Sequence, residues 1–404
     1  MRIKLTTLAA VSVATLVLTS CGSDDGGDGD TGDGATGDGA TGDGATGGLA
    51  GEGTGDDCVI EGDVAVGAAL SLTGAAASYG ESQQSGLELA AKHLAEKGGV
   101  TYDLTIEDDQ TDPRQGITVF EQFVGDDVSV IIGPTLSNGA FQAQPIAQEG
   151  GVPVLAISNT ASGITAQGDY IFRDSLTEQQ VIPQTIATAA QTYGLERVIV
   201  MYSNDDAFTE SGYEVFAGSL ESEGIEVIDT LTFSKADTDF RTLLTEARDT
   251  EPDAVVVSGL IEAAIPLVTQ ARELGIDVPI IGGNGFNNPQ LMADAGDAAE
   301  GVVVGAAWNS ASDNPENVAF LEAYDAEYDA APDQFAAQAY TGLMLIDYAV
   351  RSNCSAERDD IKAALGEIDA VPTVLGEISI NDDRDAEHPA VVQVVEDGAF
   401  AVLE

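Results

Sequence analysis

The chain has few basic side chains: 15 Lys and Arg residues stand against 69 Asp and Glu residues, and the formal net charge is −54. Nucleic acids and anionic membranes are bound through clustered Lys and Arg, so this balance excludes both as partners of the folded surface. His93 and His388 are the only histidines, and Cys21, Cys58 and Cys354 are the only cysteines. That scarcity excludes most zinc sites and leaves little material for a Cys-His nucleophile pair.

Catalytic motifs are also lacking. The sequence contains no G-x-S-x-G, H-E-x-x-H or C-x-x-C pattern and no Walker lysine. Acidic neighbours such as those at 107–109 have the chemistry of glycoside hydrolysis, but about one residue in six is acidic, so such pairs arise by chance. The sequence therefore predicts a protein that is not an enzyme and that uses no metal or cofactor.

Long apolar runs are absent except near the N-terminus, and that one is too short to span a membrane comfortably. Arg2 and Lys4 precede an apolar stretch that ends in Leu18-Thr19-Ser20-Cys21, which is typical of a secretory signal over residues 1–20. The last four residues resemble a bacterial lipobox, in which the cysteine is lipidated and becomes the mature N-terminus. The alternative is an ordinary signal peptide that happens to contain a cysteine.

Residues 21–57 are predicted to be the lipidated cysteine followed by a disordered linker. Thr-Gly-Asp-Gly-Ala is repeated from Thr31, Thr36 and Thr41, and the segment carries ten acidic residues and no basic ones. Such a composition cannot bury enough apolar surface to offset the entropy of ordering. We expect a self-repelling tether that holds a folded domain away from a surface.

The two remaining cysteines, Cys58 and Cys354, are expected to form one disulfide, since exported domains are oxidised. The alternative is two buried free thiols. The acidic excess continues through the folded region, where the lysines are few. Because high salt screens such self-repulsion, we expect the protein to come from a halophilic or marine organism.

Short β-branched runs alternate with amphipathic helical segments along most of the chain, which predicts two doubly wound α/β sheets with a ligand at the carboxyl ends of their strands. The expected strands lie at 63–70, 102–107, 128–132, 152–157, 197–202, 225–231, 254–257, 279–281 and 301–305. Expected helices include 81–97, 113–124, 139–149, 316–328, 334–351 and 358–365, and two short strands are expected near Val391 and Phe400.

A set of short motifs follows this alternation in order: Leu72-Thr73-Gly74, Tyr79-Gly80, Asp108-Asp109, Asp112-Pro113, Ile132-Gly133-Pro134, Ser137, Ile157 to Ser162, Phe172-Arg173, Gly282 to Gly285, and Ala295 to Val302. Together they make the chain, from about Val64 to its C-terminus, resemble the type I periplasmic solute-binding proteins. The resemblance is to the branched-chain amino-acid (Leu/Ile/Val-binding) branch that serves ABC importers.

This resemblance implies two lobes joined by three crossovers, with the ligand cleft between them. Lobe 1 would comprise 59–176 and 310–384, and lobe 2 would comprise 177–309 and 385–404. The implied protein is a monomer on the outer face of the cytoplasmic membrane, held there only by its lipid, that delivers an amino acid to ABC permease subunits. Two alternatives stay open: a binder of amide- or urea-like solutes, and the ligand-sensing component of a signalling receptor.

The loop around Ser137 and Asn138 leaves a strand and opens a helix, so free backbone N–H groups and hydroxyls would meet a ligand carboxylate there. The alternative is that these residues only cap the helix. By resemblance, Thr160 and Ser162 contact the α-carboxylate and α-ammonium of the ligand, and Glu178 binds the ammonium. The alternative for Thr160 and Ser162 is that they only belong to a loop rich in turn-forming residues. The alternative for Glu178 is that it is an exposed glutamate in the first turn of a helix.

Asn284 departs from the family, which usually presents a second carboxylate after the preceding glycine; the change leaves an amide or urea-like ligand open. Asp205, Asp206 and Glu262 are candidates for replacing the missing charge. Tyr79 and Phe208 match positions where the family places rings over the ligand, although either could instead be a packing residue. The apolar stretch 258–261 favours an aliphatic ligand side chain.

Overall fold

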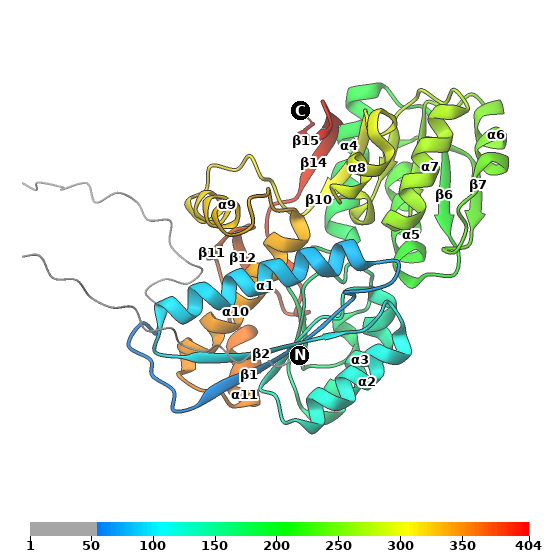
Figure 1. Cartoon of the computed structure of the whole chain (residues 1–404). Coiled ribbons are helices and arrows are strands. Elements are labelled where there is room, and N and C mark those ends of the chain that lie inside the picture. Colours follow the sequence, from blue (N-terminus) through cyan, green and yellow to red (C-terminus); the bar gives the residue numbers. More distant parts are fainter. Residues whose placement is uncertain (1–54, 404) are drawn as a thin grey trace, which may run out of the picture. The chain divides into compact units, whose positions relative to one another are not determined.

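Two β-sheets, each flanked by helices, organise the computed structural model of the chain, which describes residues 55–403 (Figure 1). The predicted signal sequence, Cys21 and nearly all of the predicted linker lie outside the described residues. Within the described part, no helix has the length and apolarity that crossing a membrane requires.

The first sheet is parallel throughout, with the order β2-β1-β3-β4-β5. Its strands are β1 (Asp63–Leu70), β2 (Thr101–Asp108), β3 (Val130–Ile132), β4 (Val154–Ala156) and β5 (Ile171–Arg173). The helices of this lobe are α1 (Ala77–Lys97), α2 (Pro113–Gly125), α3 (Ser137–Gly150), α9 (Pro315–Tyr328), α10 (Gln334–Asn353) and α11 (Arg358–Leu365). The strand order reverses between β1 and β3, which is where doubly wound sheets bind ligands.

The two faces of β1 show why helices cover both sides of this sheet. Val64 and Val66 pack into a core with α1 and α10, whereas Ala69 packs on the opposite face with α2 and α3. Successive strand residues point to opposite faces, so a strand that is apolar at every position is expected to be buried on both faces of the sheet.

The second sheet repeats the same winding and adds two antiparallel strands, in the order β15-β14-β10-β9-β8-β6-β7. Its strands are β6 (Arg197–Ser203), β7 (Glu226–Phe233), β8 (Ala254–Ser258), β9 (Ile280–Gly282), β10 (Val302–Ala306), β14 (Val391–Glu396) and β15 (Ala399–Val402). Its helices are α4 (Glu178–Tyr193), α5 (Ala207–Glu223), α6 (Arg241–Asp249), α7 (Ile261–Glu273) and α8 (Gln290–Ala295). Figure 1 shows β14 and β15 in red beside α4 and β10, so the end of the chain completes this sheet.

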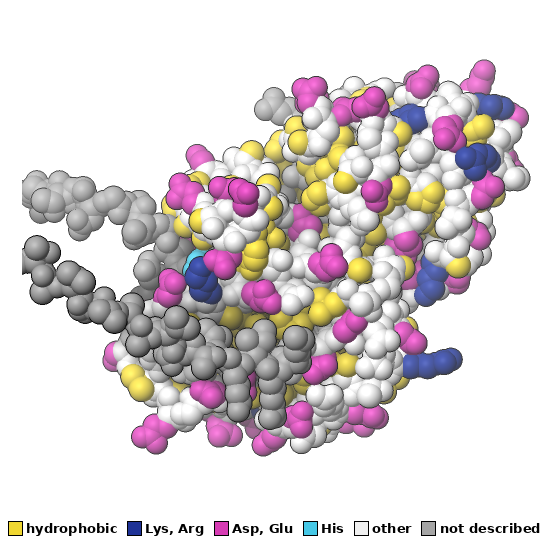
Figure 2. Space-filling view, viewed as in Figure 1, with side chains coloured by type: hydrophobic (Ala, Val, Ile, Leu, Met, Phe, Trp, Pro, Cys, Tyr) yellow, Lys and Arg dark blue, Asp and Glu magenta, His cyan; other side chains and the backbone are white. Residues whose placement is uncertain are grey.

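Three chain segments connect the lobes: 174–177 between β5 and α4, 307–314 between β10 and α9, and 388–390 before β14. The expected fold class, two doubly wound sheets joined by three crossovers, is confirmed. Figure 2 shows carboxylates scattered over the visible face with few basic groups among them, as the composition requires.

Several sequence-based element predictions were wrong in detail. Helix α1 starts at Ala77 and not at residue 81, so Tyr79 and Gly80 lie inside it. Gly80 is typical of a helix boundary, but here it lets the first turn approach the backbone of Ser71: a Cβ on Gly80 would lie 2.1 Å from the Ser71 carbonyl oxygen.

Other strands were missed because they are short. β5 was not predicted, nor was the small antiparallel sheet of β11 (Val371–Thr373), β12 (Gly376–Ile380) and β13 (Ala386–Glu387). The predicted strand at 128–132 forms only from Val130. The disulfide between Cys58 and Cys354 is present, with their Cα atoms 5.5 Å apart.

Candidate functional site

The loop between β3 and α3 brings backbone donors to the lobe interface. Gly133 has φ +102°, and a Cβ there would lie 2.3 Å from the Ala69 carbonyl oxygen, so the turn requires glycine. The N-cap of α3 is Leu136, and no side chain caps this end, so neither Ser137 nor Asn138 acts as a cap. Ser137 is buried at the first turn of the helix, where the partial positive charge favours an anion.

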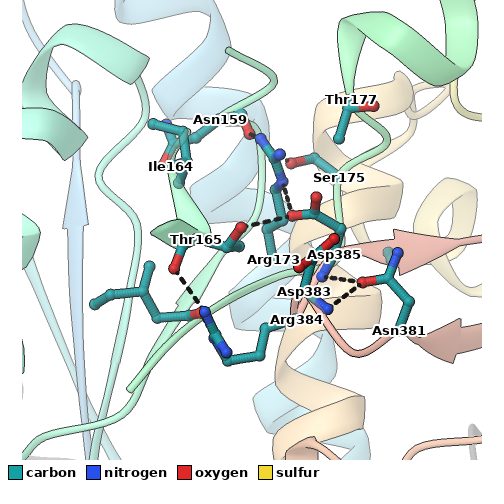
Figure 3. A network of polar contacts seen from close by, with 12 residues as sticks. Asn159, Ile164, Thr165, Arg173, Ser175, Thr177, Asn381, Asp383, Arg384 and Asp385 are labelled. Atoms are coloured by element: carbon teal, nitrogen blue, oxygen red, sulfur yellow. Dashed lines mark hydrogen bonds and ion pairs between the residues drawn. The ribbon is translucent and has the colours of Figure 1, made fainter. Parts of the chain in front are cut away.

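The loop after β4 is fixed from behind by Arg173, which is 2% exposed. Its Nη1 donates to the carbonyl oxygens of Asn159 and Ala161, each at 2.9 Å, and its Nε donates to Asp385 Oδ1 at 2.6 Å. Figure 3 shows Arg173 between Asn159 and Asp385, with Thr165 also donating to Asp385 at 3.1 Å. The two anchored carbonyls flank Thr160, so this network sets the direction of the Thr160 main chain.

Glu178, the first residue of α4, is buried at 2% exposure beside that loop. Thr160 Oγ1 donates to its Oε1 at 2.8 Å. Its Oε2 lies 3.4 Å from the place of a Cβ on Gly283 and 3.5 Å from that on Gly212, so two glycines leave room for the carboxylate. Burial raises the pKa of Glu178 to about 7, against the opposing effects of the Thr160 hydrogen bond and of Arg173.

A small cavity of about 20 Å³ lies between the lobes. Tyr79 closes one side: its hydroxyl donates to the Gly285 carbonyl oxygen at 2.6 Å and accepts from Ile261 N–H at 2.8 Å. Its ring lies 4.6 Å, centroid to centroid, from that of Phe335. Asn284 faces the cavity from lobe 2, and its Oδ1 accepts from Gln334 Nε2 at 2.5 Å. The cavity wall consists of Tyr79, Thr135, Leu136, Ser137, Ser158, Phe208, Leu260, Asn284, Gly285 and Phe335.

The structure thus places four of the eight sequence-predicted ligand contacts on this wall: Tyr79, Ser137, Phe208 and Asn284. Thr160 and Glu178 form a buried pair with each other. The remaining two lie elsewhere on the interface. Asn138 bonds Asp206 and Ala207 N–H across the cleft, and Ser162 N–H donates to Ser211 Oγ at 2.9 Å near the surface.

The acids considered as replacement charges have different surroundings. Asp206 caps α5 by accepting from the N–H groups of Phe208 and Thr209. Asp205 accepts from Ser203 Oγ at 2.9 Å and Ser234 Oγ at 2.7 Å, away from the central wall. Glu262 lies beside a second cavity described below. None of the three lines the central cavity.

Sequence reasoning did not name Thr135, Leu136, Ser158, Gly285 or Phe335 as ligand contacts, whereas Leu260 lies in the apolar stretch 258–261 that was expected to face the ligand side chain. Leu136 follows a buried strand of a doubly wound sheet, a position that could have identified it. Phe335 has no such signal, because it arrives from α10, far along the chain. Among residues 55–403, no cluster of His, Cys, Asp and Glu is arranged to hold a metal ion.

Comparison with known proteins identifies the fold family. Residues 63–399 match the family model described as periplasmic binding protein. The chain is 25% identical over 328 residues to the Leu/Ile/Val-binding protein BraC3 of Rhizobium johnstonii, which covers 80% of this chain and 89% of that protein.

Two solved structures are similar as well. The branched-chain amino acid transporter substrate-binding protein LivJ of Streptococcus pneumoniae, in complex with isoleucine, has a TM-score of 0.80 at 26% identity and covers 84% of this chain and 98% of its own. An ABC transporter solute-binding protein of Rhodopseudomonas palustris, in complex with 3,4-dihydroxybenzoic acid, has a TM-score of 0.77 at 25% identity and covers 84% and 96%. The chain therefore belongs to the periplasmic binding protein family, and it is a binding protein and not an enzyme.

Proposed function

We propose that this protein is the extracytoplasmic solute-binding lipoprotein of an ABC importer, which captures a branched-chain-like amino acid by lobe closure and delivers it to a permease. The interface between the lobes carries this proposal, because both lobes contribute to the wall of its central cavity at the carboxyl ends of their sheets. A ligand that touches both lobes only in the closed state stabilises that state. Relatives that bind leucine, isoleucine and valine support the ligand class.

The contacts divide between the two ends of an amino acid. The buried Ser137 hydroxyl and the free N–H groups at the start of α3 would bind the α-carboxylate. Thr160 and Glu178 would bind the α-ammonium, since a charged ligand group needs a carboxylate partner when water is excluded. The apolar side chains of Leu136 and Leu260 suit an aliphatic ligand side chain.

The remaining features extend the proposal to the whole chain. Cys21 would carry the lipid and residues 22–57 the tether, which places a monomer on the outer face of the cytoplasmic membrane. The lobes would follow the sequence-based bounds, 59–176 and 310–384 for lobe 1 and 177–309 and 385–404 for lobe 2, except that β13 pairs with β12 and so belongs to lobe 1. The acidic surface supports a saline habitat.

A second ligand class is favoured by Asn284. Its amide accepts a hydrogen bond from Gln334 across the lobes and adds no negative charge to the wall. A ligand without an ammonium group, such as an amide, urea or an aromatic acid like that of the Rhodopseudomonas relative, would suit this arrangement.

Calorimetric titration in molar salt separates the two classes. Wild type should bind L-leucine, L-isoleucine or L-valine, and Glu178→Gln should weaken that binding at least tenfold (about 1.4 kcal/mol) because the ammonium loses its carboxylate. Ser137→Ala should cost less, about 1 kcal/mol, because the backbone donors remain. Glu210→Gln, a first-turn exposed glutamate of α5, is the matched control and should leave binding unchanged. Unchanged leucine affinity in Glu178→Gln, or binding of benzoate or urea alone, contradicts the amino-acid assignment.

A further inference from the structure

A second and larger cavity adjoins the central one. Its volume is about 320 Å³, within the lower range of small-molecule sites. Leu136 from lobe 1 and Leu260 from lobe 2 line both cavities, so the two spaces are neighbours that share these side chains. We call the larger one the outer chamber; like the central cavity, it has walls from both lobes.

The outer chamber combines apolar walls with an excess of carboxylates. Asp109, Asp112, Asp206 and Glu262 line it, against one cation, Lys235. The Lys235 side chain is exposed, and among the described residues it has no carboxylate within ion-pair distance. The chamber is therefore negative overall and suits a positive group.

Three of these four acids already serve the fold. Asp109 Oδ1 accepts from Ser71 Oγ at 2.6 Å and from Thr111 N–H at 2.9 Å. Asp112 caps α2 and Asp206 caps α5. Their carboxylate oxygens accept hydrogen bonds from backbone N–H groups that would otherwise be unpaired, so these three acids have a structural role without a ligand.

Glu262 differs from the other three. It stands in the first turn of α7, and its buried Oε2 has no hydrogen-bond partner among the described residues. Burial raises the pKa of Glu262 to about 7 and the charge of Asp206 adds to the rise, against the opposing effects of the Glu262 backbone N–H and of Lys235. A buried carboxylate oxygen without a hydrogen-bond partner is costly, and a ligand cation beside it would reduce that cost.

We propose that the outer chamber is the second half of the ligand site, where Glu262 pairs with the positively charged end of a ligand whose carboxylate end lies in the central cavity. This proposal rests on the proposed function and extends its substrate class to amino acids with a long side chain that ends in an ammonium or guanidinium group. The chain of such a ligand would pass between Leu136 and Leu260, and its methylene groups would contact the apolar walls.

Two amino acids isolate the contribution of the distal charge. L-lysine and L-norleucine share an unbranched four-carbon side chain, and lysine adds the ε-ammonium. Calorimetric titration of the whole protein in molar salt should give an affinity for lysine at least tenfold above that for norleucine. Equal affinities, or tighter binding of norleucine, overturn the chamber proposal while leaving the amino-acid assignment intact. If lysine, norleucine and leucine all fail to bind, the proposed function itself is wrong, and this inference falls with it.

Variants then locate the effect. Glu262→Gln should lower lysine affinity at least tenfold and leave norleucine affinity within twofold. Glu273→Gln, at the exposed end of the same helix, makes the same charge change outside the chamber and should alter neither. A lysine preference that survives in Glu262→Gln contradicts the assignment of Glu262.

A steric variant gives an independent test. Gly116 lines the chamber, and a Cβ there would meet only side-chain carbons of Asp109 and Ala143, each at 4.0 Å, so a β-carbon fits there without backbone movement. Gly116→Leu should reduce lysine affinity at least tenfold and spare leucine. Retained lysine binding in a folded Gly116→Leu protein would overturn the proposal.

Discussion

At the scale of single residues, Glu178 illustrates the energetic cost of burying a carboxylate that we propose binds the ligand. Its carboxylate has one hydroxyl partner and is 2% exposed, and burial raises its pKa from 4.5 to about 7. The folded protein therefore holds a proton that the unfolded chain has lost over that pH range. A shift of this size corresponds to about 3 kcal/mol of lost stability above pH 7, at about 1.4 kcal/mol per pH unit.

The pH dependence of ligand-free stability tests this cost. The contribution of Glu178 to the free energy of unfolding should fall as pH rises from 4.5 to 7 and stay low above 7. Glu178→Gln should therefore stabilise the protein by about 3 kcal/mol at pH 8 and by little below pH 4.5, measured by denaturant unfolding. Glu210→Gln should show neither effect. A Glu178→Gln difference that does not change with pH would contradict the raised pKa.

The predicted ligand contacts stay predictions, but their positions can be compared with the structure. Tyr79, Ser137, Phe208 and Asn284 lie on the central wall. Ser137 was predicted from its place between a strand and a helix, and the other three from the family resemblance. The contact between Thr160 and Glu178 was not predicted as a pair, because it depends on how β4 and α4 pack. That Glu262 Oε2 has no hydrogen-bond partner could not be predicted either, because it depends on which residues lie beside it in the folded protein.

At the scale of elements, the loop after β4 is held by a segment more than 200 residues away. Asp385 accepts from Arg173 Nε, and its neighbour Arg384 donates to the Thr165 carbonyl oxygen at 2.9 Å. This 381–385 turn lies just before the third crossover. The ion pair between Arg173 and Asp385 therefore joins the loop after β4 to the segment that leads into that crossover (Figure 3). The motif Phe172-Arg173 was recognised in the sequence, but the strand it forms and its partner were not.

Removing the partner should be costly. Asp385→Asn removes the carboxylate that pairs with the buried Arg173 guanidinium, and we expect a loss of about 3 kcal/mol of stability together with weaker ligand binding. Asp383→Asn makes the same chemical change at an exposed side chain of the same turn and should stay within about 0.5 kcal/mol of wild type. Chemical denaturation of the two variants side by side measures the difference. Equal stabilities would mean that the pair contributes nothing to the loop.

At the scale of the whole molecule, the two doubly wound sheets followed from the alternation of buried β-branched runs with amphipathic helices. That pattern is strong because each parallel strand is buried on both faces. The small β11–β13 sheet and the early start of α1 were missed, because strands of two to five residues and a packing glycine leave no periodic signal. The chain-wide fold was thus more predictable than the boundaries of its elements.

The disulfide acts at this same scale, since Cys58 and Cys354 are 296 positions apart. Closing so long a loop restricts the unfolded chain by about 5 kcal/mol in the chain-entropy model. The double variant Cys58→Ser with Cys354→Ser should lose stability of that order in denaturant unfolding. Reduction of wild type should give the same loss, and a loss below about 1 kcal/mol in both would contradict the entropic account.

The central claim is that the two lobes close on an amino acid, and thermal unfolding in molar salt with a panel of solutes tests it most directly. A ligand at 100 times its dissociation constant should stabilise the protein by about 2.7 kcal/mol, a readable rise in melting temperature. The account predicts that rise with amino acids such as leucine, isoleucine, valine or lysine. A panel in which only urea, amides or benzoates raise the melting temperature would contradict it.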